Sequence, residues 1–193
     1  GYGFVVAAPE IFHRVEPVGT VIEPDAIGRL RGNDAARRTE IASYDAAAKA
    51  VLTWLSEQTE VDEQRLGAIG FCIGGHLSFR AAMRPEVRAT ACLYPTGLQN
   101  GKLGRGIADS LQRAGEIKGA LFTLFGSEDP HVPAEERDRV LEALQGLRHE
   151  TVLFEANHTF MRDDGWRWDP DLADQAWAAV ITFLRRELSP AQP

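Results

Sequence analysis

Short apolar runs alternate with segments of helical periodicity along most of the chain. Five runs have the length and composition of buried strands, and they span residues 2–8, 65–70, 87–94, 119–125 and 149–155. The apolar positions between Tyr44 and Leu55 fall on one face of a helix. Further helices are expected to begin at Pro133 and to span 170–188. Because strands and helices alternate, the pattern predicts an α/β chain with a mostly parallel, doubly wound sheet and helices on both faces.

Two long segments, 9–33 and 95–116, have no clear period and are rich in Pro, Gly and charge. We expect both to be loops, and loops of this length usually serve function.

The 193 residues fit one domain, 1–193, that is large enough to bury a core. The first apolar run starts directly after Gly1, and the chain has no initiating methionine. We therefore expect the domain to be N-terminally incomplete.

The charge and the cysteine content narrow the classes of partner. Twenty-one Lys and Arg residues against 28 Asp and Glu residues give a net charge of -7, the wrong sign for binding nucleic acid. No stretch is long and apolar enough to cross a bilayer. The two cysteines, Cys72 and Cys92, form neither a disulfide framework nor a zinc-site spacing. We expect a cytoplasmic protein without nucleic acid or membrane partners and without a metal or other cofactor.

The segment 70–75, GFCIGG, lies between a predicted strand and a helical pattern. This is the arrangement of a nucleophile elbow, with Cys72 in the place where serine usually stands. We expect Gly70 and Gly74 to permit the sharp turn because they lack a Cβ. The helix N-terminus would favour the thiolate of Cys72, and the backbone N–H of Ile73 would be an oxyanion donor. The alternative interpretation is a small buried cysteine in an ordinary glycine-rich turn.

Candidates for the other two members of a triad follow later predicted strands. Asp129 comes after the fourth strand, with Glu128 beside it as an alternative acid. His158 comes after the fifth strand, and His131, in the loop of the acid, is the alternative base. The order of nucleophile, acid and histidine is that of α/β-hydrolases. The sequence thus predicts a triad of Cys72, Asp129 and His158.

Together these segments resemble the dienelactone hydrolase family, the carboxymethylenebutenolidase-like proteins, over nearly the whole chain. The motifs that carry the resemblance are APEIF at 8–12, GFCIGG at 70–75, GSED at 126–129 followed by Val132 and Pro133, and HTF at 158–160 followed by Arg162. The resemblance implies the α/β-hydrolase fold, the same triad, and hydrolysis of a small ester or lactone. In the family, further strands precede the first one seen here, and they supply a glutamate beside the nucleophile and a second oxyanion donor. Nothing in this sequence matches those strands.

The resemblance also implies positions that bind substrate. An arginine shortly after the histidine binds the substrate carboxylate in the family, and Arg162 matches it. A second such arginine is matched by either Arg29 or Arg31, because the loop gives no secure register. Trp166 lies near the base, as in a subset of the family, and is a candidate pocket residue. Packing is the alternative role for this tryptophan.

A cysteine nucleophile favours activated substrates. A thiolate leaves a tetrahedral adduct more readily than an alkyl alkoxide does, whereas the stabilised enolate of an enol ester or lactone can leave first. The prediction is therefore a hydrolase that cleaves a small, activated, dienelactone-like and anionic ester or lactone through a cysteine acyl-enzyme. Two alternatives stay open: a non-catalytic binding protein of the same fold, and a glutamine amidotransferase-like enzyme. The second lacks the glutamate expected two residues after His158, where Phe160 stands.

Overall fold

The computed structural model describes residues 2–189 and contains one main parallel sheet. Its four strands lie in the order β1, β2, β5, β6, with bounds β1 (Leu66–Phe71), β2 (Val87–Leu93), β5 (Ala120–Gly126) and β6 (His149–Phe154). Every neighbouring pair is parallel. Two short strands, β3 (Lys102–Leu103) and β4 (Gly106–Ile107), form a separate antiparallel hairpin. Four of the five predicted strands and the parallel sheet are therefore confirmed.

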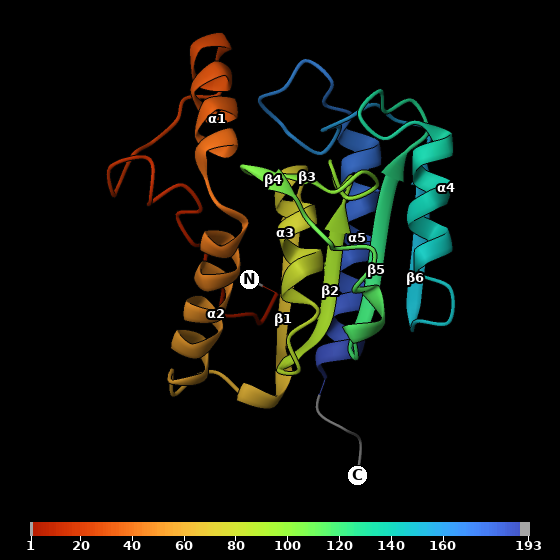
Figure 1. The fold of residues 1–193 in the computed structure, drawn as a ribbon. Helices are drawn as coiled ribbons and strands as arrows, with labels where there is room; N and C mark the ends of the chain where they lie inside the picture. The colour runs from red at the N-terminus through yellow and green to blue at the C-terminus, as the bar shows by residue number, and fades with distance from the viewer. Residues whose placement is uncertain (1, 190–193) are drawn as a thin grey trace.

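Helices cover both faces of this sheet (Figure 1). One face carries α5 (Pro170–Leu188), which lies behind the strands in the view of Figure 1. The other face carries α3 (Ile73–Ala81) and α4 (Ala134–Ala143), with α2 (Ile41–Ser56) packed beside α3. The remaining helical segments are α1 (Ala26–Arg38), η1 (Glu63–Arg65) and η2 (Ala114–Glu116). The predicted doubly wound arrangement is confirmed.

The helix α5 forms where its sequence predicts. The Asp169 side chain accepts a hydrogen bond from the Leu172 backbone N–H at 3.0 Å, and Pro170 occupies the first turn. Ala176, Val180 and other residues on one side of α5 are buried against apolar side chains of β2 and β5. Burial of each large apolar side chain stabilises the fold by about 1.5–3 kcal/mol. This packing fixes the last helix on the sheet directly after the loop that carries His158.

A second apolar cluster fills the opposite face. Phe79 of α3 and Val140 of α4 pack there against Leu121 and Phe125 of β5. The side chains of β5 thus point alternately into the two clusters, and every residue of this strand is buried. A strand buried on both faces reads as a continuous apolar run, which is why the sequence predicted it well.

The prediction of a strand at residues 2–8 is wrong. In the part of the chain that the structure describes, no strand precedes β1, and β1 pairs only with β2. Val5 and Val6 are 50% and 77% exposed, although Phe4 packs against the cluster under α5. A strand needs a neighbour for its backbone N–H and C=O groups. This run has the apolar composition of a strand, but among the described residues no neighbouring strand pairs with it.

The prediction that 9–33 is entirely loop is also wrong, because α1 begins at Ala26. Asp25 caps this helix, since its side chain accepts a hydrogen bond from the Gly28 backbone N–H at 2.7 Å. Ile27 and Leu30 point to solvent, so α1 has no buried apolar stripe that periodicity could detect.

None of the described helices is both long and apolar enough to span a membrane.

Candidate active site

The candidate catalytic residues lie at one edge of the sheet. Parallel strands end at the same edge, and Cys72 directly follows β1 while Asp129 follows β5 and His158 follows β6. The loop after β2 reaches the same edge and carries Thr96. In Figure 1 this edge is the upper one, where the loop between β6 and α5 lies. Chain segments that are far apart in sequence therefore meet at a single place.

Cys72 stands on a sharp turn between β1 and α3. Its backbone has φ 55° and ψ -122°, in a region that residues with a Cβ seldom adopt. The turn is held because the Cys72 N–H donates to the Leu93 carbonyl at 3.0 Å and the Gly75 N–H donates to the Cys72 carbonyl at 3.0 Å. Strain of this kind persists where surrounding contacts impose it, and it is frequent at functional sites.

The glycines around the turn have different roles. A Cβ at Gly70 would lie 1.9 Å from the Gly74 carbonyl oxygen, so only glycine fits there. A Cβ at Gly75 would lie 3.0 Å from Pro95, which makes a larger residue tight. A Cβ at Gly74 would meet nothing within 4 Å. The expectation that Gly74 is needed for space is wrong, because its side-chain position faces open space and Gly75 has the close neighbour instead.

Asp129 and His158 form a buried hydrogen-bonded pair. His158 Nδ1 lies 2.7 Å from Asp129 Oδ2, and the two residues are only 4% and 3% exposed. The other carboxylate oxygen, Asp129 Oδ1, accepts a hydrogen bond from the His131 backbone N–H at 2.8 Å. Among the described residues, His158 Nε2 is buried without a hydrogen-bond partner. That nitrogen is therefore available to a reacting group.

The two alternative triad members are placed differently. Glu128 is exposed, and no contact joins it to His158 in the described structure. The His131 ring lies edge-on to the His158 ring, with 4.6 Å between their centroids, and it is exposed. The Asp129 carboxylate bonds to the backbone N–H of His131 but to the imidazole ring of His158. The geometry favours Asp129 over Glu128 and His158 over His131.

Charge couples Cys72 to His158. Burial raises the pKa of the Cys72 thiol, but the His158 imidazole, then the Thr96 hydroxyl and the Ile73 backbone N–H, lower the pKa below its usual value. Burial lowers the pKa of His158, but Asp129 and Cys72 raise it to about 9. Both directions favour a thiolate and an imidazolium over a neutral thiol and imidazole.

Two further residues at this edge were not predicted from the sequence. Tyr94 directly follows β2 and has φ 37°, and its ring lies edge-on to His158 with 5.2 Å between centroids. Thr96 Oγ1 lies 3.5 Å from Cys72 Sγ. Their position just after a buried strand could have indicated a place at the site. Thr96, however, belongs to the connection 95–116, which has no sequence motif.

The expected substrate-binding residues are all exposed. Arg162 lies in the loop between β6 and α5, and its guanidinium forms a two-point ion pair with the carboxylate of Asp164. Arg31 on α1 pairs with Glu16 at 2.6 Å, and Arg29 is exposed on the same helix. The Trp166 side chain is 85% exposed and stacks under Arg167. None of these arginines contacts the triad directly in the described structure, so their roles stay predictions.

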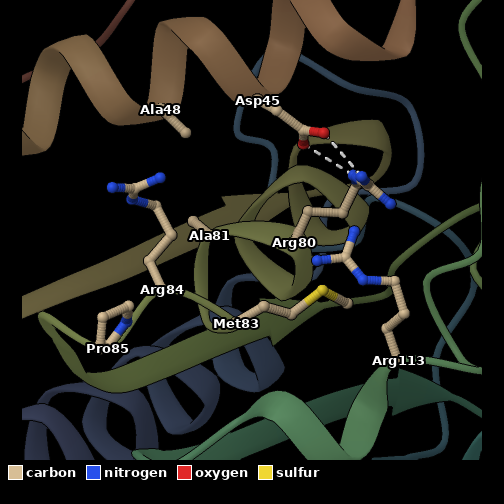
Figure 2. Close-up of a pocket in the computed structure, with 8 residues that line it drawn as sticks. All are labelled: Asp45, Ala48, Arg80, Ala81, Met83, Arg84, Pro85 and Arg113. Atoms are coloured by element: carbon tan, nitrogen blue, oxygen red, sulfur yellow. Dashed lines mark hydrogen bonds and ion pairs between the residues drawn. The ribbon is translucent and has the colours of Figure 1, made fainter.

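Two cavities lie away from the triad. One, of about 220 Å³, lies between α2 and α3, and Figure 2 shows Arg80 there with two bonds to the Asp45 carboxylate. Arg84 and Arg113 also line it, but each is paired with a carboxylate, which leaves little free positive charge. The other cavity, of about 260 Å³, is formed by the segment 9–22.

Within residues 2–189, no group of three or more His, Cys, Asp or Glu side chains is arranged to hold a metal ion.

Comparison with known proteins identifies the family and the fold. The sequence model of the dienelactone hydrolase family matches residues 1–188. The chain belongs to the dienelactone hydrolase family. Members of this family are hydrolases, and the chain shares their α/β-hydrolase fold.

Individual relatives of this dienelactone hydrolase family member are moderately similar. A Saccharomyces cerevisiae protein named "Putative carboxymethylenebutenolidase" is 33% identical, over 96% of this chain and 71% of its own length. The carboxymethylenebutenolidase of Rhodococcus opacus is 26% identical, over 97% of this chain and 72% of its own length. The solved structure titled "Putative Dienelactone Hydrolase" from Klebsiella pneumoniae superimposes with a TM-score of 0.75 at 20% identity, over 92% of this chain and 73% of that one.

Proposed function

We propose that this protein hydrolyses a small, activated and anionic ester or lactone through a cysteine acyl-enzyme, with Cys72, Asp129 and His158 as the triad. One observation carries the proposal. Cys72 stands at the strained turn before α3, where an imidazole held by a buried carboxylate favours its thiolate. A thiolate is the reactive form of cysteine, whereas a merely structural buried cysteine stays protonated.

In the first half of the reaction the thiolate of Cys72 attacks the carbonyl carbon of the substrate. The developing oxyanion accepts a hydrogen bond from the Ile73 backbone N–H, at the N-terminus of α3. The C–O bond to the leaving group then breaks, and the His158 imidazolium gives its proton to the departing oxygen. A thioester on Cys72 and a neutral His158 remain.

In the second half, water attacks the thioester while His158 takes one of its protons. The tetrahedral adduct expels the Cys72 thiolate, which faces the newly formed imidazolium, and the acid product leaves. Asp129 stays ionised throughout and stabilises the imidazolium through the 2.7 Å contact to Nδ1. The resting ion pair is thus regenerated in each cycle.

The preference for activated substrates follows from the first adduct. A thiolate leaves more readily than an alkyl alkoxide, so an adduct formed with an alkyl ester reverts to substrate. An enolate is a better leaving group, and the adduct of an enol lactone therefore proceeds to the thioester. The names of the relatives point the same way, since a carboxymethylenebutenolide combines an enol lactone with a carboxylate.

We propose Arg162 as the anchor of the substrate carboxylate. It lies four residues after His158, on the exposed loop that leads to α5. Its guanidinium is paired with Asp164, whose exposed carboxylate a substrate carboxylate could replace. Arg29 or Arg31 is proposed as the second anchor, and Trp166 as a pocket residue, on the family resemblance alone.

A panel of substrates with matched variants tests the proposed function. We expect the wild type to hydrolyse enol lactones and p-nitrophenyl esters faster than ethyl esters, and Cys72→Ala to lose this activity while remaining folded. Cys92→Ala is the matched control, because Cys92 is fully buried in β2 and its pKa is raised by burial. Iodoacetamide near neutral pH should alkylate Cys72 and leave Cys92 intact. Activity retained in Cys72→Ala would exclude the acyl-enzyme.

A further inference from the structure

Thr96 contacts the nucleophile through both its backbone and its side chain. Its N–H donates to the Cys72 carbonyl oxygen at 3.2 Å, and its hydroxyl oxygen lies 3.5 Å from Cys72 Sγ. In the described part of the chain, this hydroxyl has no other hydrogen-bond partner. The side chain is half-buried, so the contact is only partly open to water. A threonine outside the triad is therefore directed at the reacting sulfur atom.

The chain around Thr96 is bent so as to bring it there. Tyr94, the residue directly after β2, has φ 37°, and its N–H donates to the Leu124 carbonyl on the neighbouring strand. Pro95 then packs on Gly75, where even a Cβ would lie 3.0 Å away. Two non-glycine residues with positive φ thus end two adjacent strands, Cys72 after β1 and Tyr94 after β2. Such strain persists only where surrounding contacts impose it, and here it aims Thr96 at Cys72.

A buried polar contact also holds the segment 95–116, which carries Thr96, against α3. His76 on α3 is fully buried, and its Nε2 lies 2.7 Å from Ser110 Oγ, farther along the 95–116 segment. The next residue after Thr96, Gly97, is close enough that a Cβ there would lie 3.6 Å from the His76 ring. The Ser110 contact and the Thr96 N–H bond to the Cys72 carbonyl therefore fix this segment on α3 and on the turn before it, and Thr96 is not on a free loop.

We propose that the Thr96 hydroxyl donates a hydrogen bond to the Cys72 thiolate and so stabilises the charged sulfur. The direction follows from the protonation state, because a thiolate has no proton to give and the hydroxyl must be the donor. Hydrogen bonds to a charged acceptor are stronger than neutral ones, so this contact favours the reactive form. The inference rests on the proposed function of Cys72.

The test compares variants that differ in the hydroxyl alone. Thr96→Val keeps the shape and removes the donor, and Thr96→Ser keeps the donor. Thr90→Val is the matched control, because Thr90 lies on β2 and its buried hydroxyl has no partner among the described residues. The rate of iodoacetamide alkylation of Cys72 is measured against pH, with the modified cysteine identified by mass spectrometry.

We expect Thr96→Val to raise the pKa of Cys72 alkylation by about one unit, which makes alkylation about tenfold slower below the wild-type pKa. Thr96→Ser and Thr90→Val should keep the wild-type profile. A loss of packing alone would not move this pKa and would not be reversed by serine. If Thr96→Val does not fold by circular dichroism, the pair Thr96→Ala and Thr96→Ser gives the same comparison.

The outcomes separate the two proposals. If wild-type Cys72 is alkylated near neutral pH no faster than Cys92, the proposed function fails and the role of Thr96 fails with it. If wild-type Cys72 reacts as a thiolate and Thr96→Val has the same pH profile, only the role of Thr96 is overturned. An equal shift in Thr90→Val would also overturn it, because the effect would then belong to the strand rather than to the hydroxyl.

Discussion

Replacing Gly70 by alanine should damage the turn that presents Cys72, and replacing Gly74 should not. A Cβ at Gly70 would lie 1.9 Å from the Gly74 carbonyl oxygen, 2.2 Å from its carbonyl carbon and 2.5 Å from Ser78 Oγ. Two of the three atoms are backbone, so β1 and α3 would have to separate by more than 1 Å to restore an ordinary contact. Overpacking of this kind costs about 1–3 kcal/mol, and we expect the upper end because backbone must move.

Gly74→Ala is the matched control, since the new Cβ would meet nothing within 4 Å. Gly74 lies in the first turn of α3, where alanine in place of glycine stabilises a helix by up to about 1 kcal/mol. Free energies of unfolding from urea titrations should therefore differ by about 2–4 kcal/mol between the two variants. Alkylation of Cys72 should slow in Gly70→Ala only. Equal stabilities would refute the close approach of β1 and α3 at the nucleophile.

Three further predictions concern the ion pair and the substrate anchor. Asp129→Asn should lower the pKa of His158 and slow ester hydrolysis near neutral pH by at least about tenfold; an unchanged rate would contradict the triad. Because the pKa of His158 is raised from 6.5 to about 9, its contribution to stability is complete below 6.5 and is lost as the pH rises through 9. Urea titrations should show this decline, on the order of 3 kcal/mol, in wild type but not in His158→Gln. Arg162→Ala should raise KM for an anionic lactone at least about tenfold more than for a neutral ester, with Arg162→Lys intermediate; parallel increases would exclude the anchor.

The sequence predicted the elements that have a continuous apolar run or one apolar side. The strand β5 is buried on both faces, and α5 has a capping aspartate and one apolar side, so composition and period were sufficient. Residues 2–8 show the limit of this reasoning, because an apolar run becomes a strand only where another backbone lies beside it. The helix α1 shows the opposite limit, since its Asp25 cap was readable but its exposed Ile27 and Leu30 gave no stripe.

The site divides in the same way. Cys72, Asp129 and His158 could be predicted as a triad because each follows a predicted strand, and parallel strands end together. Thr96 could not, because its contact with Cys72 depends on the positive φ of Tyr94, which carries a Cβ and gives no sign of a turn. Gly74 was misjudged for a related reason: a glycine in sequence does not reveal whether its missing Cβ faces backbone or open space.

The pKa values of the two cysteine thiols are shifted in opposite directions, although both residues lie in or beside one sheet. Cys92 on β2 lies in register with Gly70 of β1, only two residues before the nucleophile. Burial raises the pKa of both thiols, and at Cys92 burial is the only cause that acts. At Cys72 the His158 imidazole, then the Thr96 hydroxyl and the Ile73 N–H at the start of α3, reverse the direction. In the proposed mechanism, the reactivity of Cys72 therefore depends on the polar groups that the strand ends bring to the sulfur rather than on its exposure. A cysteine moved along the strand should accordingly become inert.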